Sequence, residues 1–532
     1  MRNSASQVDT KPRSTGGASW WKGAISPSSL IVLLTLPVAL LLGIVIGRYS
    51  ATYAVAAAGC LVMVVIVLLR FDALTMAALI AVHLFADWYL GLHLVAISLA
   101  LVLLFAYYFG RSEERPWAAL RLPWLWMLFL TLTIYPAIHG GKLELYDLAS
   151  FYPSNILGAL LFYWLGSTVS RDGGTLRRVF QLLAAFAALL AIHSIIESVT
   201  GTFFFQSAQS TAYLVEVSNY QIEGTNAFRV GSFFIDPNWN GTFFATAFFL
   251  PFGLLIEGRG KDEPLPLLEK LLYLVEMLLI LPALLFTYSN GAWVAVLAGT
   301  FVFLIFIGRT RYRVLLLLFM GVMAALGLTL FAGQVAVQLQ HATGPNELSL
   351  RIGAWQTALR VIEASPLLGV GLGYQAYLLR ANPYRVPAQI VPLSHPHDSY
   401  LEWGAMAGVP VMLVFLALLA AAYYFACCNW RLADMRIRPL IGGGIAALAA
   451  LSIGSISING WTLPPLAAFG WLIAGMIGSP LLERWLVGRR QALAGKDEAG
   501  ARLPHYPSPG RAAQRGCRPL QADVEMEDKS CQ

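Results

Sequence analysis

The chain has 532 residues, of which 58% are hydrophobic and only 12% charged, and its formal net charge is +7. A soluble globular protein carries roughly 25% charged residues, so this chain has too few charges to cover the surface of water-soluble domains. The composition excludes a soluble enzyme and a disordered scaffold, and it indicates a polytopic membrane protein. The five cysteines include no CxxC pair, so neither a disulfide framework nor a zinc ribbon is expected.

Long apolar runs recur along most of the sequence. A helix needs about 20 mostly apolar residues to cross the hydrocarbon of a bilayer, because lipid offers the backbone no hydrogen-bond partner. The runs predict an all-α bundle of about 12 to 14 transmembrane helices. The expected helices span residues 28–47, 51–69, 73–90, 92–110, 119–138, 152–170, 179–199, 234–256, 269–288, 291–308, 314–332, 409–428, 440–459 and 463–485.

The basic residues predict the orientation of this bundle. If the N-terminus is cytoplasmic, most of the 36 Lys and Arg fall in cytoplasmic connections, as the positive-inside rule requires. The positive net charge is then a topological signal, and no nucleic-acid partner is expected. Both termini are predicted to be cytoplasmic, and two sizeable loops, 200–233 and 333–408, are predicted on the outer face.

These assignments divide the chain into five parts. Residues 1–27 are polar and basic and are expected to form a cytoplasmic N-terminal segment, followed by a transmembrane bundle over 28–332. A large outer loop over 333–408 precedes the C-terminal transmembrane helices, 409–487. The tail, 488–532, is rich in Gly, Pro, Arg and Ala, a composition typical of disorder.

The first outer loop ends in a candidate anion site. Asp236 followed by Pro237 predicts a helix N-cap with proline in the first turn, where its missing N–H does no harm. The positive end of the helix dipole would then lie beside Arg229, which suits a phosphate. The alternative is that Asp236 only caps the helix while Arg229 meets lipid headgroups, and the loop alone leaves both interpretations open.

The second outer loop begins with a predicted amphipathic helix over 346–364. Arg351 and Trp355 are four residues apart and therefore share a face of this helix. Pro366 ends the helix, and a GxGxG run over 369–373 follows. This run lacks a preceding strand, so a dinucleotide-binding fingerprint is not expected.

The same loop continues into a histidine motif. His397 is predicted to lie just before a short helix, in which Ser399 and Glu402 fit a capping box. Histidine is the side chain best suited to removing a proton from a hydroxyl near neutral pH. His395 and His397 are also possible metal ligands, but no further ligand cluster with recognisable spacing accompanies them. No metal or other cofactor is therefore predicted.

Four residues from distant parts of the sequence are predicted to share one side of the membrane. Arg229, Arg351, His395 and His397 all fall in the outer loops. Arginine suits a diphosphate, because its planar guanidinium binds oxygen pairs and stays charged. The topology thus indicates a polar site at the outer face.

The motifs around these residues resemble the signature region of the O-antigen ligase/polymerase superfamily. The resemblance is carried, in chain order, by Arg229-x-Gly-x4-Asp236-Pro237-Asn238, Thr287-Tyr288-Ser289-Asn290-Gly291, Arg351-x3-Trp355, Gly369-x-Gly371-x-Gly373 and His395-Pro396-His397-Asp398-Ser399-Tyr400-Leu401-Glu402. It implies a metal-independent glycosyltransferase of the bacterial inner membrane. Such enzymes take a glycan from undecaprenyl diphosphate on the periplasmic face and transfer it to a sugar hydroxyl of lipid A–core or of another lipid-linked glycan.

The resemblance also implies roles for individual residues. Arg229 and Arg351 would bind the diphosphate, and His397, with His395 beside it, is the candidate base that activates the acceptor hydroxyl. Supporting roles are expected for six further residues, namely Asp236, Asn238, Ser289, Asp398, Glu402 and Trp355.

This sequence departs from the family pattern at two positions. Asn290 stands where the family commonly has arginine in Ser-Arg-Gly, which removes one phosphate ligand; Arg380 and Arg385 are candidate substitutes. Asp398 stands where asparagine commonly follows the histidine.

Two rival functions draw on other features. A transporter or flippase of lipid-linked or anionic substrates is favoured by His83 with Asp87 and His193 with Glu197, since ionisable pairs at i,i+4 in predicted spans are candidate proton relays. Both pairs lie toward the outer ends of their helices, where they would equally line a catalytic cavity. A noncatalytic assembly partner is the third possibility.

Overall fold

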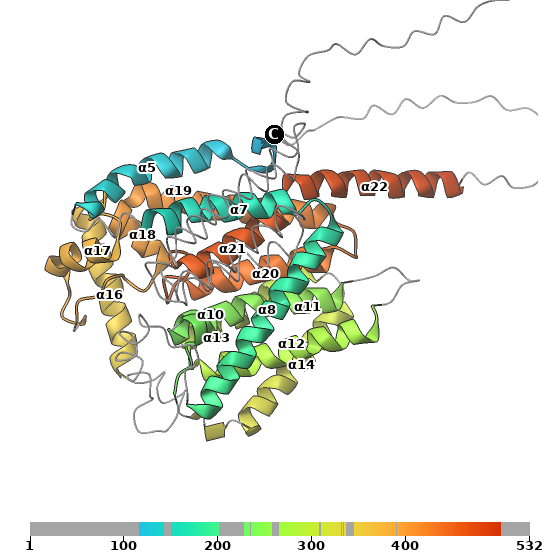
Figure 1. The fold of residues 1–532 in the computed structure, drawn as a ribbon, viewed down its shortest axis with the longest axis horizontal. Helices are drawn as coiled ribbons and strands as arrows, with labels where there is room; N and C mark the ends of the chain where they lie inside the picture. The colour runs from blue at the N-terminus through green and yellow to red at the C-terminus, as the bar shows by residue number, and fades with distance from the viewer. Residues whose placement is uncertain are drawn as a thin grey trace, which may run out of the picture. The chain divides into compact units, whose positions relative to one another are not determined.

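The computed structural model confirms the predicted all-α class. Its regular secondary structure is α-helical, with short 3₁₀ and π segments, within the residues that it describes (Figure 1). The helices predicted over 28–110 lie outside these residues. The structure describes residues 116–142, 151–201, 228–234, 236–257, 265–307, 310–330, 332–333, 335–336, 345–389 and 391–501.

Helices form at each span predicted from 119–138 onward. They are α5 (Pro123–Gly141), η3 (Tyr152–Leu157) running into α7 (Gly158–Val169), α8 (Gly173–Thr200), α10 (Pro237–Ala247) with α11 (Phe249–Ile256), α12 (Leu267–Phe286), α13 (Asn290–Phe306), α14 (Thr310–Leu330), α19 (Val409–Leu432), α20 (Arg438–Gly454), and α21 (Pro464–Ile477) followed by α22 (Pro480–Ala501). The two loops that the sequence predicts on the outer face contribute η5 (Ser232–Phe234), α16 (Pro345–Ala364), α17 (Tyr374–Ala381), η6 (Asn382–Tyr384) and α18 (Ser399–Ala407), and η2 (Pro116–Ala119) precedes α5.

The described helices are those of a multi-pass membrane protein. Four stretches are long and apolar enough to cross a bilayer: Gly173–Thr200, Pro237–Ile256, Val409–Leu432 and Pro464–Ala492. One face of the shorter helix α13 carries a stripe of exposed apolar side chains at helical spacing, Val294, Leu297, Phe301 and Ile305. Water would penalise such a stripe, whereas lipid accommodates it.

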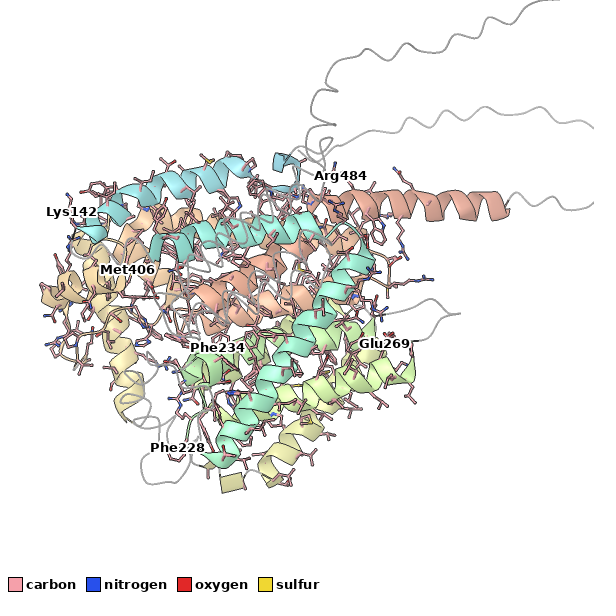
Figure 2. The ribbon with its side chains drawn as sticks, in the orientation of Figure 1. Lys142, Phe228, Phe234, Glu269, Met406 and Arg484 are labelled. Atoms are coloured by element: carbon pink, nitrogen blue, oxygen red, sulfur yellow. The ribbon has the colours of Figure 1, made fainter. Side chains whose placement is uncertain are left out.

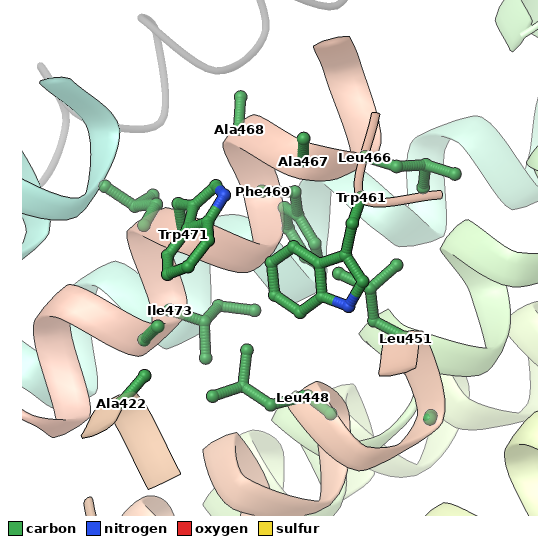
Figure 3. Close-up of a cluster of buried hydrophobic side chains, with 14 of the residues drawn as sticks. Ala422, Leu448, Leu451, Trp461, Leu466, Ala467, Ala468, Phe469, Trp471 and Ile473 are labelled. Atoms are coloured by element: carbon green, nitrogen blue, oxygen red, sulfur yellow. The ribbon is translucent and has the colours of Figure 1, made fainter. Parts of the chain in front are cut away.

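Buried aromatic rings hold the C-terminal helices together (Figure 3). The ring centroids of Trp461 and Trp471 are 5.1 Å apart, and Trp471 lies 5.1 Å from Trp126 on α5. Trp461 and Trp471 are each 1% exposed. Aromatic rings in such arrangements bury large apolar areas. The segment that carries Trp461 is therefore fixed firmly to the bundle.

The helix predicted over 440–459 ends early. α20 stops at Gly454, and residues 455–463, here called the α20–α21 loop, connect it to α21. Serine and asparagine are weak helix formers, and Ser457 Oγ donates to the backbone oxygen of Gly454 at 3.1 Å. Pro464 opens the next helix at its first position. This difference from the prediction matters because the loop contacts residues of the candidate site.

The last predicted span, 463–485, is interrupted between α21 and α22. Ser479 Oγ donates a hydrogen bond to the backbone oxygen of Ser167 at 2.6 Å, and Pro480 starts α22. α22 extends to Ala501, past the expected start of the tail at 488. The chain divides into two compact units, 1–488 and 489–532, and the site below lies wholly in the first.

Candidate functional site

Arg229 is buried between the ends of two helices. It is 5% exposed; its Nε donates to the backbone oxygen of Thr287 at 3.1 Å and its Nη2 to Asn238 Oδ1 at 2.7 Å. Thr287 follows α12 and Asn238 lies in the first turn of α10. In Figure 2 the labels Phe228 and Phe234 mark the two ends of the short segment that carries Arg229.

The predicted cap of α10 is confirmed. Asp236 is the N-cap and Pro237 stands in the first turn. Asp236 Oδ1 accepts from the backbone N–H groups of Asn238 at 2.6 Å and Trp239 at 3.4 Å. The aspartate that begins the helix therefore also fixes the residue that accepts from Arg229.

Both predicted arginines influence the pKa of Asp236. Burial raises the pKa of Asp236, and the positive charges of Arg229 and, more weakly, Arg351 oppose the rise. The hydrogen bonds agree with this: Arg229 donates to Asn238 in the first turn of α10, and Arg351 donates to Ser457 in the α20–α21 loop, which also accepts from Trp239 of that turn. The structure thus brings together two arginines that are far apart in the sequence.

Arg351 also reaches the histidine motif. It lies on α16, is half-buried, and its Nη1 donates to the backbone oxygen of Ser457 in the α20–α21 loop. Its charge contributes to lowering the pKa of both His395 and His397. Arg351 is therefore the residue that connects the arginine side of the site with the histidine side.

The two histidines touch each other. Their ring centroids are 4.2 Å apart at 61°, and the backbone N–H of His397 donates to His395 Nδ1 at 3.2 Å. Burial lowers the pKa of His395 to about 4 and that of His397 well below its ordinary value. Both rings are thus neutral at pH 7. Part of each histidine remains exposed, so a substrate can reach it.

The predicted capping box of α18 is wrong by one residue. Asp398 is the N-cap, and its Oδ1 accepts from the backbone N–H groups of Tyr400 and Leu401, both at 2.8 Å. Ser399 cannot do so, because its Oγ accepts from the N–H of Trp461 at 2.9 Å and its own N–H donates to Ser455 at 3.0 Å. Helix α18 still begins directly after His397, as predicted.

Backbone strain gathers around these segments. Among the described residues four other than glycine have a positive φ, and three of them border the site: Ser232 at 50°, Tyr288 at 49° and His397 at 55°. Side chains with a Cβ rarely adopt this conformation, and it persists only where surrounding contacts impose it. Strain of this kind is typical of functional sites.

The remaining supporting residues are placed differently from one another. Ser289 is 1% exposed and caps α13, accepting from the N–H of Ala292 at 3.4 Å. Glu402 is 1% exposed inside α18, and burial raises its pKa well above the ordinary value. Trp355 is half-buried on α16, and its indole N–H has no hydrogen-bond partner among the described residues.

The first N–H groups of the glycine run are used in packing against α18, so they are not available to a phosphate. The N–H groups of Val370 and Gly371 donate to the backbone oxygens of Ala405 and Met406, each at 2.9 Å. Gly369 has φ 62° and lies so close to Met406 that a Cβ would collide with its backbone. Arg380 is a candidate substitute for the missing arginine, and its Nη1 donates a hydrogen bond to the backbone oxygen of Val370 at 2.6 Å.

One polar pair of the rival interpretation lies against the Arg229 segment. His193 Nδ1 is 2.8 Å from Ser232 Oγ and 3.4 Å from Glu197 Oε1. Both residues belong to the C-terminal part of α8. His83 and Asp87 lie outside the described residues.

Sequence reasoning missed the α20–α21 loop. Its backbone oxygens accept from Arg351 and from the N–H of Ser399, and its Asn459 Oδ1 accepts from Trp239 Nε1 at 2.9 Å. The available signal was the run of polar residues at the outer end of a predicted span. The first turns of α10 and α18 are both hydrogen-bonded to this loop, through Trp239 and Ser399.

Residues 276–416 match the family model of O-antigen ligases. The match runs from α12 into α19 and includes Ser289, Arg351 and both histidines. This part of the chain is similar to O-antigen ligases. This confirms the resemblance drawn from the motifs and indicates a membrane glycosyltransferase-like enzyme with a role in assembling O-antigen or a related polysaccharide. Arg229 and the α20–α21 loop lie outside the matched residues, and no curated protein matches the chain at a significant level.

Proposed function

We propose that this O-antigen ligase-like protein transfers a glycan from undecaprenyl diphosphate to a sugar hydroxyl at the periplasmic face of the bacterial inner membrane, without a metal ion. The acceptor is lipid A–core or another lipid-linked glycan. The observation that carries the proposal is a connected set of hydrogen bonds: Arg229 donates to the first turn of α10, and Arg351 donates to the loop that also bonds to this turn. The electrostatics agree with these contacts. Arg229 and Arg351 both act on Asp236, while Arg351 also acts on His395 and His397.

The arginine side of the site suits the leaving group. When the glycosidic bond breaks, negative charge develops on the diphosphate, and donors that are already in position stabilise it without reorganising. Arg229 is held in place by Thr287 and Asn238, and Arg351 by Ser457. The N-terminus of α10 is capped by Asp236, and its contribution is to hold Asn238 against Arg229.

The hydrogen bond between the histidines supports His397 as the base. His395 Nδ1 accepts from the N–H of His397, so neutral His395 carries its proton on Nε2. Neither nitrogen of His395 then offers a lone pair to the acceptor hydroxyl. The ring of His397 is not constrained in this way by His395, which supports assigning proton removal to it.

The proposed step is a single displacement with inversion. The imidazole of His397 takes the proton of the acceptor hydroxyl as its oxygen bonds to the anomeric carbon. The bond between that carbon and the diphosphate oxygen breaks at the same time, and the electron pair leaves with the diphosphate. Arg229 and Arg351 neutralise the leaving group, and the proton passes from His397 to water.

The supporting residues are assigned by what they touch. Asn238 and Asp236 orient Arg229, and Asp398 starts α18 beside His397. Ser289 fixes the start of α13. Glu402 is too buried to meet substrate and is assigned to packing in its neutral form.

The position of His193 and Glu197 supports a transferase over a transporter. The pair contacts Ser232 on the segment that carries Arg229, so it belongs to the wall of the proposed site. A proton path across the membrane would require polar residues continuing away from this site.

The decisive experiment supplies purified protein in lipid nanodiscs with an undecaprenyl-diphosphate glycan, with and without lipid A–core. Formation of longer lipid-linked glycans without the core identifies a polymerase, and transfer to the core identifies a ligase. The matched variants are His397→Ala and, as control, His139→Ala on α5. Movement of the lipid across a vesicle without any transfer would overturn the proposal in favour of a flippase.

A further inference from the structure

We infer that Asn459, in the α20–α21 loop, is a positioning residue that aligns the arginine side of the site with the histidine side. The inference rests on the proposed glycan transfer. Asn459 lies outside the matched family residues and outside every motif identified in the sequence.

The amide of Asn459 is buried and uses both of its ends. The residue is 1% exposed; its Oδ1 accepts from Trp239 Nε1 at 2.9 Å and its Nδ2 donates to the hydroxyl oxygen of Tyr374 at 3.1 Å. An indole N–H only donates, so the partner of Trp239 must be the amide oxygen. The chemistry of the partners thus fixes the orientation of the amide.

Each partner belongs to a different side of the site. Trp239 lies in the first turn of α10. Its backbone N–H donates to Asp236, the carboxyl whose pKa both arginines lower. Tyr374 begins α17, and its ring centroid is 5.7 Å from that of His395. One amide therefore joins the two halves of the proposed catalytic site.

The rest of the loop makes contacts of the same kind. The oxygen of Ser457 accepts from Arg351, and the oxygen of Ser455 accepts from the N–H of Ser399, two residues after His397. The N–H of Trp461 donates to Ser399 Oγ. Loop residues on both sides of Asn459 thus contact site segments from other helices.

The loop is stiff enough to hold a position. The indole of Trp461 is packed against Trp471 in the apolar cluster of Figure 3. Thr462 Oγ1 donates to the backbone oxygen of Asn459 at 3.1 Å, closing the turn around it. The amide of Asn459 is buried, so breaking either of its side-chain hydrogen bonds would leave a buried donor or acceptor unpaired, which favours the observed geometry.

The consequence of this arrangement is kinetic. Transfer requires the acceptor oxygen, the anomeric carbon and the leaving diphosphate to be in line, and a misplacement of about 1 Å can cost about 100-fold in rate. Loss of the Asn459 amide frees α10 and α17 to shift relative to each other. It should lower kcat while leaving the binding of each substrate largely intact.

The test compares Asn459→Leu with Asn429→Leu in the transfer assay. Asn429, on α19, is as buried as Asn459, and its side chain also makes two hydrogen bonds, both donated by Nδ2, to the backbone oxygens of Ile477 and Ser479. We expect Asn459→Leu to lower kcat by about 10- to 100-fold with little change in KM. Asn429→Leu should lower the Tm and the yield but leave kcat per folded molecule near that of the wild type.

Two further variants separate positioning from folding. Asn459→Asp keeps an acceptor for Trp239 and one for the Tyr374 hydroxyl, so it should recover part of kcat. Tyr374→Phe should reproduce part of the loss, and combining it with Asn459→Leu should add nothing. Wild-type kcat in Asn459→Leu, or equal loss of kcat in both leucine variants, overturns the inference. Absence of transfer by the wild-type protein would instead refute the proposed function.

Discussion

Helices α10 and α18 begin in the same way but present different chemistry. Each starts with an aspartate, Asp236 or Asp398, whose carboxylate accepts from two backbone N–H groups of the first turn. Two guanidinium groups oppose the rise in the pKa of Asp236. Burial likewise raises the pKa of Asp398, to about 6; there backbone hydrogen bonds rather than arginines oppose the rise, and a histidine precedes the aspartate. An aspartate cap therefore fixes geometry, whereas the neighbours decide whether the helix end serves an anion or a proton.

The largest expected effect concerns His397, the proposed base that precedes α18. His397→Ala should lower the rate of glycan transfer by about 10²- to 10⁴-fold, the contribution typical of a general base. The measurement is turnover of lipid-linked glycan by purified protein, normalised to the folded fraction. His139→Ala, the control, should retain its activity. Full turnover in the double variant lacking His395 and His397 would exclude both as the base.

The anion side should respond nearly as strongly. Arg229→Lys and Arg351→Lys keep a positive charge but lose the planar pair of donors, so each should lower kcat by about 10²- to 10³-fold. Arg360→Lys, on the exposed face of α16, is the matched control and should behave as wild type. Wild-type rates in both site variants would show that the arginines do not clamp the diphosphate.

A pH profile distinguishes the two arginines. The base must be neutral to act, so activity is lost as the pH falls through its pKa, which Arg351 helps to lower. Removing that charge raises the pKa, and the acid limb of the residual activity in Arg351→Gln should move to higher pH. The reference is Arg229→Gln, whose limb should stay closer to that of the wild type. An unmoved or lowered limb in Arg351→Gln contradicts the assigned geometry.

Asp398→Asn should have the smallest effect. Asparagine is as good an N-cap as aspartate, so α18 should stay intact. In the wild type the folded pKa of about 6 exceeds the ordinary 3.8, so the folded state holds more protons and stability decreases as the pH rises through this window. The variant should lose this part of the dependence of Tm on pH. An unchanged slope would show that Asp398 does not titrate there.

Local signals allowed much of the fold and part of the site to be predicted. Asp236 with Pro237 marks the start of α10 unambiguously, and Pro366 marks the end of α16, because these residues act on their own backbone. At α18 two capping residues are adjacent, and local sequence cannot choose between them. Asp398 is the N-cap because Ser399 is hydrogen-bonded to Trp461, 62 positions away in the sequence.

The α20–α21 loop could not be predicted for a related reason. Ser455, Ser457 and Asn459 interrupt an apolar run only weakly, so hydropathy extends the span across them. Their importance comes from partners on α10, α16, α17 and α18, none of which is near in the sequence. Long-range hydrogen bonds of this kind leave no periodic trace in a single sequence.

The left-handed backbone of His397 has a consequence for saturation mutagenesis at this position. Glycine and asparagine enter this conformation readily, while a β-branched side chain clashes with its own main chain. Glycine and asparagine substitutions should therefore accumulate in the membrane at wild-type abundance and be catalytically silent. Valine and isoleucine should be depleted by quality control before their chemistry can be assayed, so abundance must be scored separately from turnover.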